Sequence, residues 1–201
     1  KYLTAGFILE EGLEFKSLEK IVSSMAKEAK AQNVKIVTGD TKVVPRGKAD
    51  KIFINMSGLG LVQKRFKASQ IKPGDKILIN GPIAQHGLSI LLSREKFSFR
   101  GQIKSDCNSL WGIVKLLLQA NIEIHFMRDP TRGGIAAVAN EIAAVCGYSV
   151  RLDEESIPIT ASCRNLSEIL GLELLDIANE GKMVFFIASR DAQRAVKLLK
   201  N

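Results

Sequence analysis

The sequence is poor in the residues that build disulfide frameworks and compact metal sites. Its three cysteines, Cys107, Cys146 and Cys163, lie far apart without a CxxC pair, and its only histidines are His86 and His125. An odd number of dispersed cysteines is typical of a reducing compartment, so we expect a cytoplasmic protein in which all three are small core residues. His125 lies in the apolar run IEIHF, which favours a hydrogen-bonded core residue over a metal ligand.

Long apolar runs and aromatic residues are also scarce. No segment approaches the roughly 20 apolar residues that cross a bilayer, and the N-terminus lacks the layout of a signal peptide, so we expect no membrane partner. The net charge is +8 at pH 7, but the basic residues are dispersed and aromatic residues make up only 6%. This pattern predicts a basic surface suited to anionic small molecules rather than to nucleic acid.

The length of 201 residues allows one large domain or two smaller ones with real cores. Residues 5–62 alternate as strand, helix, strand, loop and strand, and Ser17 is the expected cap of the helix. A Pro-Gly-Asp turn follows, and we place domains at residues 1–66 and 67–201. The alternation continues beyond it, with YSVRL (148–152) as one of the expected strands. This order predicts an α/β or α+β protein.

Three polar loops are expected between the apolar elements, and each offers one carboxylate. They are GDTK (39–42), RDPTRGG (128–134) and NEGK (179–182). Carboxylates can hold Mg²⁺, basic side chains neutralise phosphate, and glycines admit a ligand close to the backbone. The sequence has no GxxxxGK[ST] or GxGxxG motif. Each loop by itself is therefore also consistent with a plain turn or a helix cap.

Seven segments together carry a specific resemblance to a known family. They are GFILEEG, VTGDTKVVPRG, FINMSGLG, GDKILINGPIAQHG, RDPTRGGIAAVANEIA, IPI and ANEGKMVFFI, and they span essentially the whole chain. The set resembles the HypE family of hydrogenase-maturation proteins, in the PurM-like superfamily of aminoimidazole ribonucleotide (AIR) synthetase. The resemblance implies a two-domain PurM-like fold. Residues 1–66 would be a partial ATP-binding and dimerisation domain, and residues 67–201 the C-terminal AIR synthetase-like domain.

The resemblance also implies a reaction and its partners. In this family a carbamoyl group, received from the carbamoyltransferase HypF on a C-terminal cysteine thiol, is dehydrated with ATP to a thiocyanate. The cyano group then passes to a HypC–HypD complex and becomes a cyanide ligand of the iron in nickel–iron hydrogenase. The resemblance therefore implies ATP and Mg²⁺ as cofactors and a homodimeric protein.

The same resemblance assigns roles to residues of the three loops. Lys42 would face the amide oxygen and the γ-phosphate, and Glu180 would be the base that removes the nitrogen proton. Asp40 and Asp129 would bind Mg²⁺ and phosphate. The other residues expected around the nucleotide are Thr41, Thr131, Arg132, Gly133 and Asn179. A surface salt bridge for Lys42 and a loop hydrogen bond or helix cap for Glu180 are the alternatives.

The chain departs from the pattern of a full-length family member. That pattern has strands and aspartates before Lys1 and an acceptor cysteine after Asn201, so we expect these residues alone to be inactive. Gln85 stands where the family usually has an acid before His86, which weakens a metal role there. Two alternatives stay open: another ATP-dependent enzyme of the superfamily, such as a selenophosphate synthetase-like one, and a non-catalytic module that docks the HypC–HypD complex.

Overall fold

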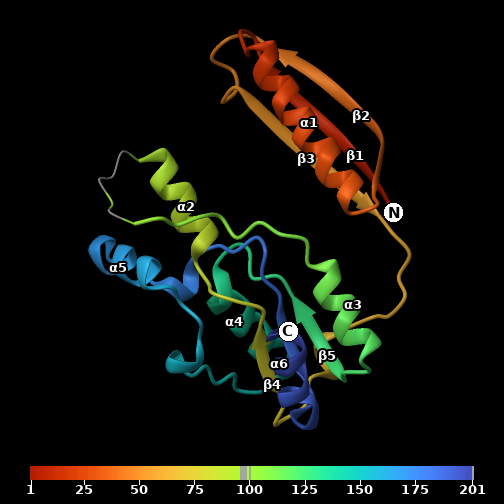
Figure 1. Cartoon of the computed structure of the whole chain (residues 1–201), viewed down its shortest axis with the longest axis vertical. Coiled ribbons are helices and arrows are strands. Elements are labelled where there is room, and N and C mark those ends of the chain that lie inside the picture. The colour runs from red at the N-terminus through yellow and green to blue at the C-terminus, as the bar shows by residue number, and fades with distance from the viewer. Residues whose placement is uncertain (96–98, 100, 201) are drawn as a thin grey trace. The chain divides into compact units, whose positions relative to one another are not determined.

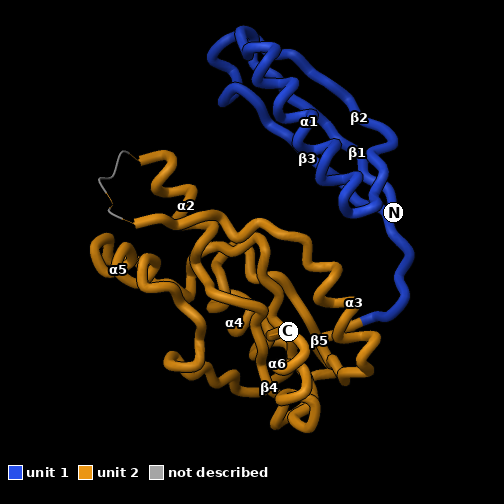
Figure 2. Tube along the Cα trace, in the orientation of Figure 1, with its two compact units in different colours: residues 1–65 blue, residues 66–201 orange. Residues whose placement is uncertain are grey.

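A computed structural model of the protein describes residues 1–95, 99 and 101–200. The chain divides into two compact units, Lys1–Arg65 and Phe66–Asn201 (Figure 2). Each unit has its own three-stranded sheet (Figure 1). Helices and strands are mixed in both units, so the expected class, α/β or α+β, is confirmed.

Unit 1 is a three-stranded sheet with one helix. Its elements are β1 (Tyr2–Glu10), α1 (Phe15–Ala31), β2 (Lys35–Val44) and β3 (Ile52–Leu59). β1 is central, parallel to β2 and antiparallel to β3. Ala5 of β1 is buried, and α1 turns a half-buried stripe toward this face of the sheet at Leu18, Ile21 and Met25. Ser17 lies inside the first turn of α1 and is not its cap, because the helix begins at Phe15.

Strand β2 runs through residues 39–42, which were expected to form a loop. β1 pairs with β2 along this stretch, with Gly6 opposite Asp40. Gly39 permits the pairing, because a Cβ at this position would lie 2.2 Å from the carbonyl oxygen of Ala5. The loop prediction was wrong because Gly and Asp are common turn residues, whereas here a parallel neighbour satisfies their backbone groups.

Unit 2 surrounds a second three-stranded sheet with helices. The strands β4 (Lys76–Ile79), β6 (Val184–Ile187) and β5 (Ile124–Arg128) are antiparallel, with β6 central. The helices are α2 (Gln85–Arg94), α3 (Trp111–Gln119), α4 (Gly134–Cys146), α5 (Ala161–Leu170) and α6 (Ala192–Lys200). Short 3₁₀ turns are η1 (Ala68–Gln70), η2 (Glu154–Ser156), η3 (Leu174–Asp176) and η4 (Ser189–Asp191). No helix in the described part of the chain is long and apolar enough to cross a membrane.

One expected strand is missing from unit 2. The segment at residues 148–152 has no regular secondary structure and, together with β4, lines a hollow of about 900 Å³. Its alternating pattern predicted a strand because pattern alone does not show whether a neighbouring backbone is available for pairing.

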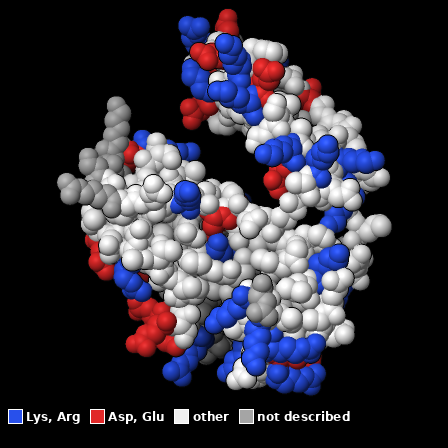
Figure 3. Space-filling model, viewed as in Figure 1, with Lys and Arg blue, Asp and Glu red and all other residues white. Residues whose placement is uncertain are grey.

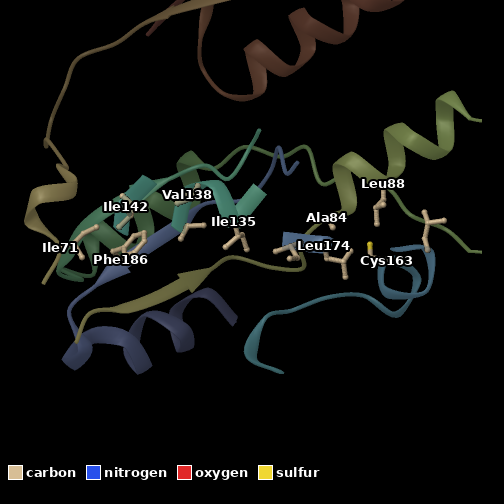
Figure 4. Packing of buried hydrophobic residues seen from close by; sticks show 12 residues of the cluster. Ile71, Ala84, Leu88, Ile135, Val138, Ile142, Cys163, Leu174 and Phe186 are labelled. Atoms are coloured by element: carbon tan, nitrogen blue, oxygen red, sulfur yellow. The ribbon is translucent and has the colours of Figure 1, made fainter. Parts of the chain in front are cut away.

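The core of unit 2 lies on both faces of its sheet. The four residues of β6 are all buried and alternate between two clusters. Val184 and Phe186 belong to a cluster with buried residues of α2, α4 and α5, and Figure 4 shows Phe186 beside Ile142 of α4. Phe185 and Ile187 pack with α3 and α6. Burying each such side chain stabilises the fold by about 1.5–3 kcal/mol, so β6 fixes the positions of the loops at its ends.

His125 is a buried, hydrogen-bonded residue, as predicted. Its Nδ1 lies 2.6 Å from Asp75 Oδ2, and its Nε2 lies 2.8 Å from Glu123 Oε1. Lys72 and Arg190 also contact Glu123, at the basic end of unit 2 that Figure 3 shows around α6. Burial lowers the pKa of His125, but hydrogen bonds to both carboxylates and their charges outweigh it, so the pKa is raised. The hydrogen bond from His125 lowers the pKa of Glu123.

This network should make the stability of unit 2 depend on pH. The contribution of His125 is present below its unfolded pKa, about 6.5, and is lost as pH rises through the raised folded pKa. The contribution of Glu123 is present above its unfolded pKa, about 4.3, and is lost as pH falls through the lowered folded pKa. The network therefore stabilises unit 2 most at pH values between the unfolded pKa of Glu123 and the unfolded pKa of His125.

We expect His125→Asn to lower the free energy of unfolding by about 2 kcal/mol near pH 5.5 and by less as pH rises above 6.5. Urea unfolding followed by the fluorescence of Trp111, the only tryptophan, would measure this within unit 2. A difference between wild type and variant that stays constant from pH 5 to pH 9 would contradict the prediction.

Candidate functional site

One face of the unit 1 sheet carries polar side chains around a glycine. Gly6 of β1 pairs with Asp40 of β2 on one side and with Asn55 of β3 on the other. Lys42 follows Asp40 by two residues, so strand alternation puts both on the same face. These residues line a hollow of about 450 Å³. Its floor is open at Gly6, because a Cβ there would meet only the backbone oxygen of Asn55, at 3.8 Å.

Thr41 lies on the opposite face of the sheet from its two neighbours. Its backbone N–H donates to Asp40 Oδ1 over 2.8 Å, but its side chain belongs to the face on which Ala5 is buried. The side chains at positions 40, 41 and 42 therefore do not converge, as they could in a loop. Asn55 was not among the predicted site residues, although the alternation of FINMSG puts this amide on the face that Gly6 leaves open.

In unit 2, Asn179 ties three loops together. Its side chain is fully buried, and its Oδ1 accepts a hydrogen bond from the backbone N–H of Ala84 over 2.9 Å. Its Nδ2 donates to the carbonyl oxygens of Pro130, at 3.1 Å, and Ile177, at 2.9 Å. The amide thus links the loop before α2, the RDPTRGG loop and the NEGK loop. With these bonds made and no exposed surface, Asn179 is suited to positioning the loops.

A buried ion pair lies next to the NEGK loop. Asp106 Oδ2 is 3.0 Å from Lys182 Nζ, and the two side chains are only 2% and 8% exposed. Asp106 Oδ1 accepts hydrogen bonds from the backbone N–H groups of Glu180, at 3.1 Å, and Gly181, at 3.4 Å. Within the described residues Oδ2 accepts no well-aligned hydrogen bond, so charge holds the ammonium there. Asp106 was not among the predicted site residues, because its only signal in the sequence is an acid in the polar run SDCN before a helix.

Glu180 and His86 face each other beside this ion pair. The Glu180 side chain is 45% exposed, and its Oε1 lies 4.0 Å from His86 Nε2. His86 Nδ1 lies 2.9 Å from Ser105 Oγ and 3.6 Å from Cys107 Sγ. Cys107 is exposed, so the expectation of a core cysteine was wrong here. The reason is that α3 begins at Trp111, which leaves Cys107 in the preceding loop.

The RDPTRGG loop leads into α4 next to Asn179. Asp129 and Arg132 are exposed, and Thr131 is half-buried. Gly133 precedes the helix with φ of 70°, and Gly134 opens it with φ of 57°. A Cβ at Gly134 would lie 2.1 Å from a carbonyl oxygen of η3, so this turn requires glycine. The loop therefore presents exposed charges and a helix N-terminus at a fixed place in unit 2.

The predicted site residues fall into two groups, one in each unit. Asp40, Thr41 and Lys42 belong to unit 1, and the remaining six belong to unit 2. The described residues contain no group of three or more His, Cys, Asp or Glu side chains that could hold a metal ion. Single exposed carboxylates such as Asp40 and Asp129 instead fit an Mg²⁺ ion that arrives on nucleotide phosphates and needs only one or two carboxylates.

Comparison with known proteins matches both units. Residues 1–62 match the family model of the AIR synthase related protein, N-terminal domain, and residues 72–201 match the model of the C-terminal domain. The carbamoyl dehydratase HypE of Azotobacter vinelandii is 44% identical over 201 residues, which are 99% of this chain and 59% of that protein.

Solved structures give the same match. A HypE in complex with ATP is 44% identical with a TM-score of 0.93, over 100% of this chain and 61% of that chain. A HypE–HypF complex contains a chain 42% identical with a TM-score of 0.95, over 99% of this chain and 66% of that chain. The present chain thus spans less than two thirds of the length of these relatives.

Proposed function

Because the chain belongs to the AIR synthase related protein family and matches its HypE members, we propose that the protein is an ATP-dependent carbamoyl dehydratase of hydrogenase maturation. One observation carries the proposal: the sheet face with Asp40 and Lys42, and the Glu180 loop fixed by Asp106, occur together in a chain 44% identical to a carbamoyl dehydratase. These observations favour a carbamoyl dehydratase over a selenophosphate synthetase-like enzyme. A non-catalytic docking module is an outcome of the test below.

The proposed reaction converts a sulfur-bound carboxamide, R–S–C(O)–NH₂, and ATP into the thiocyanate R–S–C≡N, ADP and inorganic phosphate. An amide oxygen is a poor leaving group, but it leaves readily as phosphate once it has been phosphorylated. Lys42 would neutralise charge on the amide oxygen and the γ-phosphate during this transfer. Glu180 would take the nitrogen proton as the C≡N bond forms. Both are catalytic residues in this proposal.

Each unit offers its own candidate residues for the nucleotide and its Mg²⁺. Asp40 in unit 1 and Asp129 in unit 2 would each offer a carboxylate to Mg²⁺, which would supply charge neutralisation at the phosphates. Arg132 and Thr131 would contact phosphate oxygens, and the backbone at Gly133 would add the favourable N-terminus of α4. Thr41 would act through its backbone N–H, which orients the carboxylate of Asp40. Asn179 would act by holding the loops in place.

The partners are proposed from the relatives. HypF would supply the carbamoyl group, which a solved HypE–HypF complex supports for a chain 42% identical to this one. A HypC–HypD complex would accept the cyano group. Residues 1–66 would serve ATP binding and homodimer formation, and residues 67–201 would form the AIR synthetase-like C-terminal domain. We place the reaction in the cytoplasm.

The test is the ATP-dependent loss of one water from the carbamoylated acceptor peptide of the full-length gene product. Intact mass measured after carbamoylation by HypF, with ATP or with a non-hydrolysable analogue, should show the loss only with ATP. If the acceptor peptide keeps its carbamoyl mass while ATP is bound, the protein is a docking module and not a dehydratase.

A further inference from the structure

Among the residues that the structure describes, Cys107 is the only cysteine that combines an exposed thiol with a neighbouring base. Cys163 is buried, which raises the pKa of its thiol, and Cys146 is half-buried with its Sγ donating to the carbonyl oxygen of Ala68 at 3.0 Å. Cys107 Sγ instead lies 3.6 Å from His86 Nδ1. It is therefore the thiol that a reagent or substrate can reach with a proton acceptor already beside it.

The imidazole of His86 has different partners on its two nitrogens. Glu180 Oε1 lies 4.0 Å from Nε2, which favours a proton on that nitrogen. Nδ1 then presents its lone pair to Ser105 Oγ, at 2.9 Å, and to the thiol of Cys107. Ser105 Oγ also lies 3.2 Å from Cys107 Sγ, so it can donate to the sulfur once the thiol has lost its proton. Nucleophile, base and orienting carboxylate follow one another as in activated thiol sites.

The members of this relay are attached to one framework. The side chain of Asp106, which precedes Cys107, is buried and accepts hydrogen bonds from the backbone N–H groups of Glu180 and Gly181. The turn that carries His86 is bonded to the same loop, because the N–H of Gly87 donates to the carbonyl oxygen of Ala178 over 3.1 Å. The thiol, the imidazole and the carboxylate are thus held near one another by backbone contacts.

We propose that Cys107 is a second thiol nucleophile, with His86 as its base and Glu180 orienting the imidazole, and that it accepts a sulfur-bound cyano group. The thiol gives its proton to His86, and the thiolate attacks the nitrile carbon of R–S–C≡N. A new carbon–sulfur bond forms at Cys107, the bond to the donor sulfur breaks, and the leaving thiolate takes the proton from His86. No oxidant or reductant is required. The source of R–S–C≡N rests on the proposed dehydratase function.

The test incubates the 201-residue chain with a small aryl thiocyanate and follows cyanylation of each cysteine-containing peptide by mass. Cys107 should react at least about tenfold faster than Cys146, and His86→Gln should lower the Cys107 rate by about tenfold or more, the low end of general-base effects. His86→Gln should also move the pH profile of the Cys107 rate toward higher pH. Cys146→Ser is the matched control and should leave the Cys107 rate unchanged.

Buried Cys163 reports whether each variant stays folded, because local unfolding would expose it to the probe. With Cys163 still protected, a Cys107 rate equal to that of Cys146, or one unaffected by His86→Gln, overturns the proposal. The probe requires neither ATP nor a carboxamide, so that result would leave the dehydratase function standing. A reactive Cys107 in a protein that fails to dehydrate its carboxamide would overturn the assigned source of the cyano group instead.

Discussion

Glu180→Gln should slow ATP-dependent dehydration by about 100-fold or more, because a positioned general base contributes about 10²–10⁴-fold to rate. Glutamine keeps the size of the side chain but cannot take the nitrogen proton. The loop should keep its shape, since Asp106 holds it through the backbone N–H groups of Glu180 and Gly181, which the substitution leaves in place. Single-turnover dehydration and ATP affinity, measured separately on the full-length protein, would separate loss of the base from loss of binding.

Glu173→Gln is the matched control for this experiment. Glu173 is an exposed glutamate of the same unit, so its replacement makes the same change of charge away from the loop. Dehydration should be nearly unchanged in this variant. If Glu180→Gln dehydrates at the wild-type rate, or loses activity only because ATP no longer binds, Glu180 is not the base.

Breaking the buried ion pair should be the largest single-residue effect on stability. Asp106→Asn leaves the Lys182 ammonium buried without its partner. Lys182→Met likewise leaves the Asp106 carboxylate buried without its partner. Each change should cost about 3–5 kcal/mol, because an uncompensated charge stays in a poorly solvated place. The double variant should recover much of the loss, because asparagine can still accept from the backbone of the NEGK loop.

Urea unfolding followed by Trp111 fluorescence would give the four free energies of this cycle. Arg164→Gln is the control, because the side chains of its ion pair are exposed to solvent, 47% for Arg164 and 82% for Glu154. Losing this pair should lower the free energy of unfolding by about 1 kcal/mol or less. Costs that add without coupling in the Asp106→Asn, Lys182→Met double variant would show that the two side chains do not stabilise each other.

Local signals predicted much of the fold. Helix α5 (Ala161–Leu170) has a local signal at each end, since Thr160 accepts a hydrogen bond from the N–H of Cys163 and Gly171 ends the helix with φ of 65°. Such caps and the apolar spacing between them are local in sequence. The continuous apolar run of β6 is likewise typical of a strand buried on both faces.

The errors arose where the outcome depends on a distant partner. GDTK looked like a turn, but pairing with β1 extended it into β2 and sent Thr41 to the face opposite Asp40. Asp106 stabilises the NEGK loop through its ion pair with Lys182, which lies far along the chain. No local spacing in the sequence reveals this contact. The resemblance to a known family was enough to identify Lys42 and Glu180 as candidate site residues. Asn55 and Cys107 become candidates only once the strand register and the loop contacts are known.

The central claim is that ATP activates the oxygen of a sulfur-bound carboxamide. The most direct measurement is to label that oxygen with a heavy isotope, add ATP to the carbamoylated full-length protein and find where the label goes. The label should appear in inorganic phosphate, because the oxygen leaves bonded to phosphorus. Label that is released into water, or that stays in the acceptor peptide while ATP is hydrolysed, would contradict it.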